Sequence, residues 1–343
     1  MNPQSFADLT EKCCGNSMNR RSFLKSTALP FGIATLGGTP KIQIIGEETV
    51  SPSADSESLV TFLYKSLSDL QREMICMSFD HKKRSQVENN WHITKARVGE
   101  HFTPDQQDLI KQIFLSLHSP EYREAVFEQV AWDTDEEGLE DCSIALFGKP
   151  GVGKFEFVLT GRHVTRRCDG DSLEGSAFGG PIFYGHQAGK YFDEPANHPG
   201  NAYWYQAKRA NEVFQMLDGK QRDLALLNKP RKEEGTKTVK LTGRTSDLPG
   251  IPIEGLSGDQ KEHVRKVLAD VLAPFRKKDA TEALNLIEPA QFDHLHMAFY
   301  KHNDIGNDGV WDVWQIEGPS ALIFFRGEPH VHAYIHIRKE PIA

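Results

Sequence analysis

The chain has 343 residues, of which 26% are charged and 38% are hydrophobic, a globular composition that excludes disordered and fibrous classes. Its formal net charge of −8 at pH 7 argues against nucleic-acid binding, because contact with phosphates requires a basic face. No stretch is long and apolar enough to cross a bilayer, so we expect no membrane span in the mature protein.

Residues 1–55 resemble a twin-arginine signal peptide followed by a linker. Residues 20–25 read Arg-Arg-Ser-Phe-Leu-Lys, and the mildly apolar run 26–38 that follows is too short to span a membrane. Residues 39–55 are rich in Pro, Ser and Glu. We therefore expect the twin-arginine export machinery to carry this chain to the periplasm or cell envelope. That route accepts folded cargo, often with a cofactor already inserted, which favours a metal or cofactor here.

The segments after the leader begin with helical patterns and continue with strand patterns. Residues 56–77 have helical periodicity, and a second helix begins at Thr103. Residues 142–147 and 154–166 have strand-like patterns. Residues 169–202 are rich in Gly and aromatic residues and show no regular pattern, so we expect a long ordered loop that forms a lid or pocket wall, or a connection without a role of its own.

The turn at residues 148–154 reads Gly-x-x-x-x-Gly-Lys, as a phosphate-binding loop does. The next residue is Phe155, which lacks the hydroxyl that such a loop offers to magnesium. A strand pattern follows where a phosphate loop must open a helix. We therefore predict a hairpin turn here and no nucleotide hydrolysis.

The rest of the chain repeats the order of helices followed by strands. Helical patterns cover 203–227 and 257–275. The strand-like segments are 295–300, 309–316, 321–325 and 330–338. Runs of helices followed by runs of hairpin-linked strands predict an α+β fold.

Four helix starts share a capping-box pattern, in which Ser, Thr or Asp follows an apolar residue and Gln comes three residues later. The glutamines are Gln71, Gln106, Gln221 and Gln260. The first and third are 150 residues apart, and the second and fourth are 154 apart. Such a slowly drifting offset predicts two tandem α+β repeats, over residues 56–200 and 201–343, although common helix caps can also coincide by chance.

The fourteen histidines include a cluster near the C-terminus. His330, His332 and His336 alternate on one strand and share one face, but His336 lies about 20 Å from His330 and cannot join the same ion. A second His-x-His pair ends at His296, and His163 lies on the main strand of the first repeat. If these imidazoles meet in space, they form a site for zinc, copper or iron. Otherwise they lie on an exposed sheet face with no metal.

Several of these motifs resemble the bacterial family called domain of unknown function 3500. They are the capped helix starts, the strand 155–166 with its Gly-Arg-His, Leu-His-Met-Ala-Phe at 295–299, Ile-Glu-Gly-Pro at 316–319 and His-Val-His at 330–332. The family tends to have Gly-His-His at residues 161–163, where this chain has Gly-Arg-His. The resemblance covers about 60–338 and points to His163, His296, His330 and His332 without implying an activity.

Two functions remain open at this stage. The first is an exported metal-dependent enzyme with ligands from these four histidines, in which His186 or Glu194 of the long loop acts as acid or base. The second is a non-catalytic extracytoplasmic protein that binds a small molecule or glycan through aromatic residues. Those residues are Phe183, Tyr184, Tyr191, Tyr203 and Trp204. Proximity of His163 to His330 and His332 would favour the enzyme.

Overall fold

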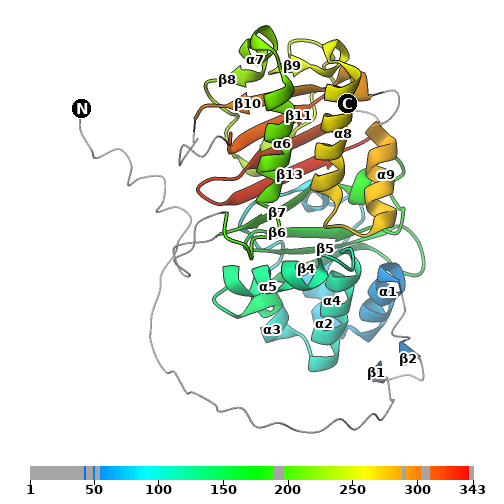
Figure 1. Cartoon of the computed structure of the whole chain (residues 1–343). Helices are drawn as coiled ribbons and strands as arrows, with labels where there is room; N and C mark the ends of the chain where they lie inside the picture. The colour runs from blue at the N-terminus through cyan, green and yellow to red at the C-terminus, as the bar shows by residue number, and fades with distance from the viewer. Residues whose placement is uncertain are drawn as a thin grey trace, which may run out of the picture. The chain divides into compact units, whose positions relative to one another are not determined.

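One sheet of eleven strands, almost entirely antiparallel, organises the part of the chain that the computed structural model describes (Figure 1). That part comprises residues 42–43, 49–50, 55–187, 197–287, 291–302 and 310–339. The two-stranded pair β1 (Ile42–Gln43) and β2 (Thr49–Val50) is separate from this sheet. No helix within the described ranges has the length and apolar character needed to cross a membrane.

The other strands are β3 (Cys76–Met77), β4 (Ser143–Gly148), β5 (Phe155–Gly161), β6 (Val164–Cys168), β7 (Ile182–His186), β8 (Leu226–Leu227), β9 (Ile251–Pro252), β10 (His296–Tyr300), β11 (Val313–Glu317), β12 (Ala321–Arg326) and β13 (Val331–Ile337). The α-helices are α1 (Ser56–Ser66), α2 (Asp69–Ile75), α3 (Val98–His101), α4 (Pro104–Ser116), α5 (Arg123–Asp133), α6 (Tyr205–Met216), α7 (Gly219–Ala225), α8 (Gly258–Leu272) and α9 (Lys277–Ile287). Short 3₁₀ helices are η3 (Lys82–Ser85), η4 (Gly138–Asp141), η5 (Ala177–Gly179), η6 (Gly235–Val239), η7 (Ile253–Gly255) and η8 (Phe292–His294).

The sheet has two halves that meet at β7 and β13. Its order is β3-β4-β5-β6-β7 in the first half and then β13-β12-β11-β10-β8, with β9 also paired to β10. The outermost pairs correspond, because β3 is parallel to β4 and β8 is parallel to β10, whereas the remaining pairs are antiparallel. The hairpin predicted at residues 148–154 joins β4 to β5.

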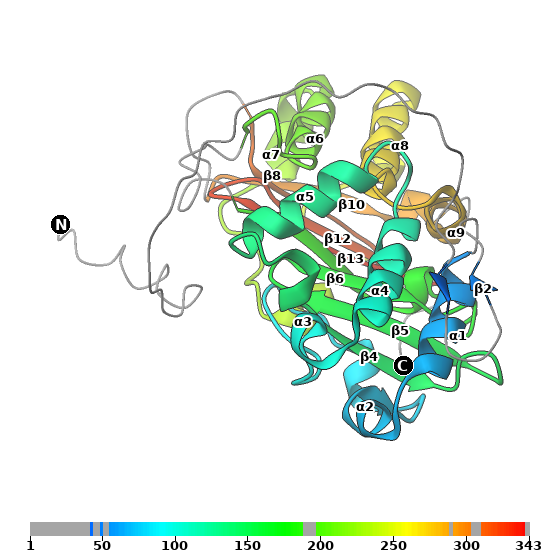
Figure 2. The same ribbon diagram turned by 90° about the horizontal axis from the view of Figure 1, so that it is seen from below.

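The helices cover one face of this sheet, with α1, α4 and α5 over the first half and α6, α8 and α9 over the second (Figures 1 and 2). Their apolar residues and those of the strands form one large core, which includes Phe114, Phe157, Val271 and Trp314. Irregular segments cover the opposite face, where Val87 and Val239 pack on strand residues in a smaller cluster.

The α+β class predicted from the sequence is therefore confirmed. The two halves match in strand order and in the placing of their helices, which is what a tandem duplication would produce. The duplication itself stays a prediction, since strand order alone does not establish common descent of the halves.

Each of the four predicted capping boxes is present. The sequence did not indicate that they would pair. The amide of Gln71 donates to Gln106 at 2.7 Å, and the amide of Gln106 donates back at 3.1 Å. Gln260 and Gln221 exchange the same bonds at 2.8 and 3.2 Å. In each half, two helix N-termini are thus tied together by their own caps.

The expectation that residues 169–202 lack regular structure is wrong for residues 182–186, which form β7. All five are buried, so the strand has no alternation of apolar and polar residues by which it could be identified. Flanking glycines and Pro181 also make the segment look like a loop. This short strand occupies the centre of the sheet.

We predict that Gln106→Ala lowers the free energy of unfolding by about 1–2 kcal/mol, because it removes the bond that the N–H of Thr103 donates to Gln106 and the paired bonds to Gln71. Urea denaturation monitored by circular dichroism measures this change. Gln112→Ala, on the exposed side of the same helix, is the control. Equal midpoints for the two variants would show that the paired caps add nothing.

Candidate metal centre

Three histidines from the two halves meet where β7 adjoins β13. His163, His330 and His332 each offer one nitrogen, and these three atoms lie within 4.8 Å of one another. The ring centroid of His163 is 5.0 Å from that of His330 and 5.1 Å from that of His332. Nε2 of His330 is 2.8 Å from Nε2 of His332. The predicted meeting of His163 with the C-terminal pair is therefore present.

The turn between β5 and β6 presents His163. Its backbone has a left-handed φ of 56°, which a two-residue hairpin turn requires. The backbone N–H of His163 donates to Asn89 O at 2.8 Å, and its carbonyl accepts from the N–H of Gly185 at 3.1 Å. These two bonds fix the turn to a loop on one side and to β7 on the other.

The start of β13 presents the other two ligands. His332 lies opposite Gly185 of β7 in the antiparallel register. A Cβ on Gly185 would come within 2.3 Å of Val331 O and 3.3 Å of the His332 ring. Glycine is therefore required for this close approach, which brings the His332 imidazole against the first half of the sheet.

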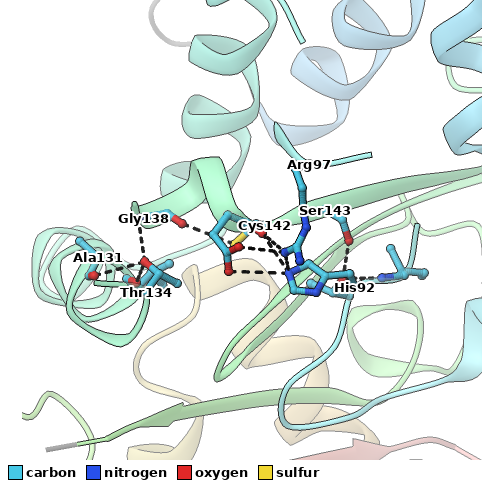
Figure 3. A network of polar contacts seen from close by, with 11 residues as sticks. His92, Arg97, Ala131, Thr134, Gly138, Cys142 and Ser143 are labelled. Carbon is cyan, nitrogen blue, oxygen red and sulfur yellow. Dashed lines mark hydrogen bonds and ion pairs between the residues drawn. The ribbon is translucent and has the colours of Figure 1, made fainter. Parts of the chain in front are cut away.

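A carboxylate supports the ligand from the first half. Asp133 Oδ2 lies 3.2 Å from Nδ1 of His163, and both side chains are buried. Asp133 is the last residue of α5, which ends there because Thr134 donates to Val130 O and accepts the N–H of Gly138, both at 2.7 Å (Figure 3). The helix end thus places the carboxylate beneath the ligand.

A second carboxylate supports the ligand from the other half. Glu233 Oε2 is 2.5 Å from Nδ1 of His332, and Glu233 Oε1 is 3.2 Å from Nη1 of Arg326. Contact of a carboxylate with Nδ1 favours the tautomer that carries its proton there, which leaves the Nε2 lone pair for a metal. His332 has this arrangement, and the Asp133 carboxylate lies beside Nδ1 of His163 at the longer distance of 3.2 Å.

The electrostatics keep the C-terminal pair in the form that binds metals. Burial lowers the pKa of His330 well below 6.5, and the charges of His332 and Arg326 lower it further. The pKa of His332 is also lowered well below 6.5, mainly by burial and then by the charges of Arg326 and His163. Burial alone would raise the pKa of Asp133, but its interactions with His163 and His186 outweigh it and hold that pKa at about 2.

This donor set fits a transition metal. A metal ion requires deprotonated imidazole nitrogens, and at neutral pH His330 and His332 are neutral. Three imidazoles with carboxylates behind two of them suit zinc, copper or iron, and three protein ligands leave a coordination position for a further group.

A second histidine pair extends from the same carboxylate. Asp133 Oδ1 is 3.3 Å from Nδ1 of His186, whose Nε2 is 3.0 Å from Nε2 of His198. Nδ1 of His198 accepts the N–H of Gly200 at 3.1 Å, so His198 must donate from Nε2 to His186. His186 is fully buried with both nitrogens against protein partners. It is placed to orient Asp133, and through it His163, rather than to meet a substrate.

The remaining predicted site residues lie elsewhere. His296 begins β10, with β11 and β12 between it and β13, so the structure does not bring it to the three-histidine group. Glu194 lies outside the described residues. His336 is further along β13, where its Nδ1 is 3.0 Å from Val239 O.

Sequence reasoning missed Asp133, Glu233, Arg326 and the pairing of His198 with His186. Asp133 ends a helix and Glu233 lies in a run rich in charged residues, so neither belongs to a motif. Only the tertiary fold brings them to the histidines. His198 was visible in the loop, but no pattern linked it to a partner.

We predict that Asp133→Asn weakens zinc binding about 10- to 100-fold, the usual effect of losing a carboxylate behind a histidine ligand. Competition with a chromophoric chelator measures the affinity. Asp141→Asn is the matched control, because Asp141 also lies near a histidine, His92 (labelled in Figure 3), but does not belong to the three-histidine group. Unchanged affinity in Asp133→Asn would mean that this carboxylate does not support a ligand.

Comparison with known proteins adds a family and no activity. No curated protein and no solved structure matches the chain. The family model described as "Protein of unknown function (DUF3500)" matches residues 50–339, which include His163, His330, His332 and both supporting carboxylates. Since this match covers most of the sequence, the chain belongs to the DUF3500 family.

Proposed function

We propose that this protein is an exported metal-dependent enzyme, with His163, His330 and His332 as ligands of a single zinc, copper or iron ion. One observation carries the proposal: imidazoles from both halves converge on one point, and two of them contact a carboxylate through Nδ1. Histidines that serve only as hydrogen-bonding residues on a sheet do not need this arrangement. In metal centres it is the common way to orient a ligand.

The number of ligands favours catalysis over a purely structural ion. Structural zinc sites use four protein ligands, whereas catalytic sites use three and leave a position for water or substrate. When bound, the metal supplies a Lewis acid or redox centre. The protein's own residues orient the ligands: Asp133 and Glu233 hold His163 and His332, and the buried His186 holds Asp133 from behind.

The alternative, a small-molecule or glycan-binding protein, has less support. Of the aromatic residues considered for it, Phe183, Tyr184, Tyr203 and Trp204 are buried, and Tyr191 lies outside the described residues. The rings of Tyr184 and Tyr203 contact each other in the core, with centroids 4.5 Å apart. These four side chains therefore pack inside the protein and offer no surface to a glycan.

We predict about one zinc, copper or iron per chain in protein purified after export, as measured by elemental analysis. The double variant His330→Ala/His332→Ala loses this metal, because one imidazole cannot retain it. His336→Ala, on the same strand, is the control and keeps the metal. Removal of the metal with a chelator lowers the melting temperature of the wild type, since the ion binds only the folded state.

A wild type that holds no metal, and takes up none when zinc, copper or iron is added, would refute the proposed centre. Full metal content in the double variant would refute the assignment of the ligands. A screen of ester, amide and oxidisable substrates then separates enzyme from binding protein, because turnover must disappear in the double variant.

The proposal of export rests on residues 20–25, which lie outside the described residues. We predict that replacing Arg20 and Arg21 by lysine stops export, because the arginine pair is an address read by a receptor and not a membrane anchor. Fractionation of expressing cells, with an antibody against the protein, measures this. Unchanged export of the variant would contradict the twin-arginine route.

A further inference from the structure

Arg326 contacts one of the proposed metal ligands, and one of its guanidinium nitrogens has no hydrogen-bond partner in the structure. It ends β12, where it lies opposite His332 in the register. Its Nη1 is 3.2 Å from Glu233 Oε1, and its Nη2 is 3.2 Å from Nε2 of His330. Its Nε is buried without a hydrogen-bond partner. The side chain is 16% exposed, so it lies between the ligands and solvent.

The contact with His330 conflicts with metal binding. A metal would take the Nε2 lone pair of His330, and that lone pair would then be unavailable as an acceptor for Nη2 of Arg326, which lies 3.2 Å away. The two uses exclude each other. An ion held by His330 would therefore leave one N–H of Arg326 without this acceptor, while Glu233 still holds Nη1.

The net charge around the three histidines, with an ion bound, then favours binding of an anion. Imidazoles that bind a metal are neutral, so Asp133 and Glu233 would supply two negative charges, and Arg326 and a divalent ion three positive ones. Arg162 is also close enough for its charge to act on His330. An excess of positive charge in a largely buried site is costly unless an anion joins it. Arginine is the side chain that best matches the two oxygens of a carboxylate or phosphate.

Resting on the proposed function, we propose that Arg326 is an anion-binding residue, and that the substrate carries an oxyanion group, a carboxylate or phosphate, which bridges the metal and Arg326. The released N–H of Nη2 and the unpartnered Nε–H both donate to this group. Glu233 has two roles in this arrangement, because it orients His332 with one oxygen and Arg326 with the other.

Cobalt is a suitable probe, because its visible absorption changes with its coordination. We would load the full-length wild type, Arg326→Gln and Arg326→Lys with cobalt and titrate each with acetate and, separately, with phosphate. In the wild type both anions change the spectrum, and the one that binds more tightly identifies the group on the substrate. In Arg326→Gln the affinity for that anion falls at least tenfold. Arg326→Lys keeps the positive charge but loses the paired N–H groups of the guanidinium, so its anion affinity is intermediate.

Two controls test the specificity of this effect. Imidazole, a neutral ligand, binds equally to the wild type and Arg326→Gln. Arg222→Gln, which alters an arginine of α7 that donates to backbone carbonyls at the end of α6, leaves anion affinity unchanged. Cobalt affinity in Arg326→Gln stays equal or rises, because the competitor for the His330 lone pair is gone.

The possible failures are distinguishable. A wild type that takes up no cobalt overturns the proposed function and this inference with it. A wild type that binds cobalt, but whose anion affinity is the same in Arg326→Gln, overturns the inference alone. Loss of cobalt binding in both Arg326 variants would assign the arginine to support of Glu233 and His332, and would also overturn it.

Discussion

The pairing of β7 with β13 is the contact on which the other features depend. Five residue pairs, from Val331–His186 to Ile335–Ile182, join two half-sheets into one. The register matters as much as the pairing, because a shift of one residue would turn His332 toward the helices. In the observed register His332 lies over Gly185, and the N–H of Gly185 holds the turn that carries His163. The same backbone contact therefore completes the core and assembles the three histidines.

Each half contributes an imidazole with its own carboxylate. The first supplies His163 with Asp133, and the second supplies His332 with Glu233. The carboxylates come from opposite sides, since Asp133 ends a helix on the helical face and Glu233 lies in the irregular segment after β8. His163 can lie near Asp133 on the helical face and near His332 on the other face because it is in a turn at the end of the strands. A regular strand position would direct its ring to one face only.

Local patterns were enough to predict much of this fold, and they failed where tertiary contacts decide. The capping boxes were predictable because a cap is formed by residues three apart, and His330 and His332 were predictable as a pair because alternate strand residues share a face. β7 was not, because a strand buried on both faces has no alternation. Asp133 and Glu233 carry no local signal, since Asp133 is about 30 residues from His163 and Glu233 is about 100 residues from His332 in the sequence. His296 shared the His-x-His pattern, but sheet order, which the pattern does not encode, sets it apart from the others.

The division of the ligands between the halves has a consequence for folding. His163 and His330 are 167 residues apart in the chain. An ion held by both would act as a reversible cross-link that closes a very long loop, and such cross-links restrict the unfolded chain most when the loop is long. Ion occupancy and cohesion of the seam between the half-sheets are then thermodynamically coupled, so that loss of one weakens the other.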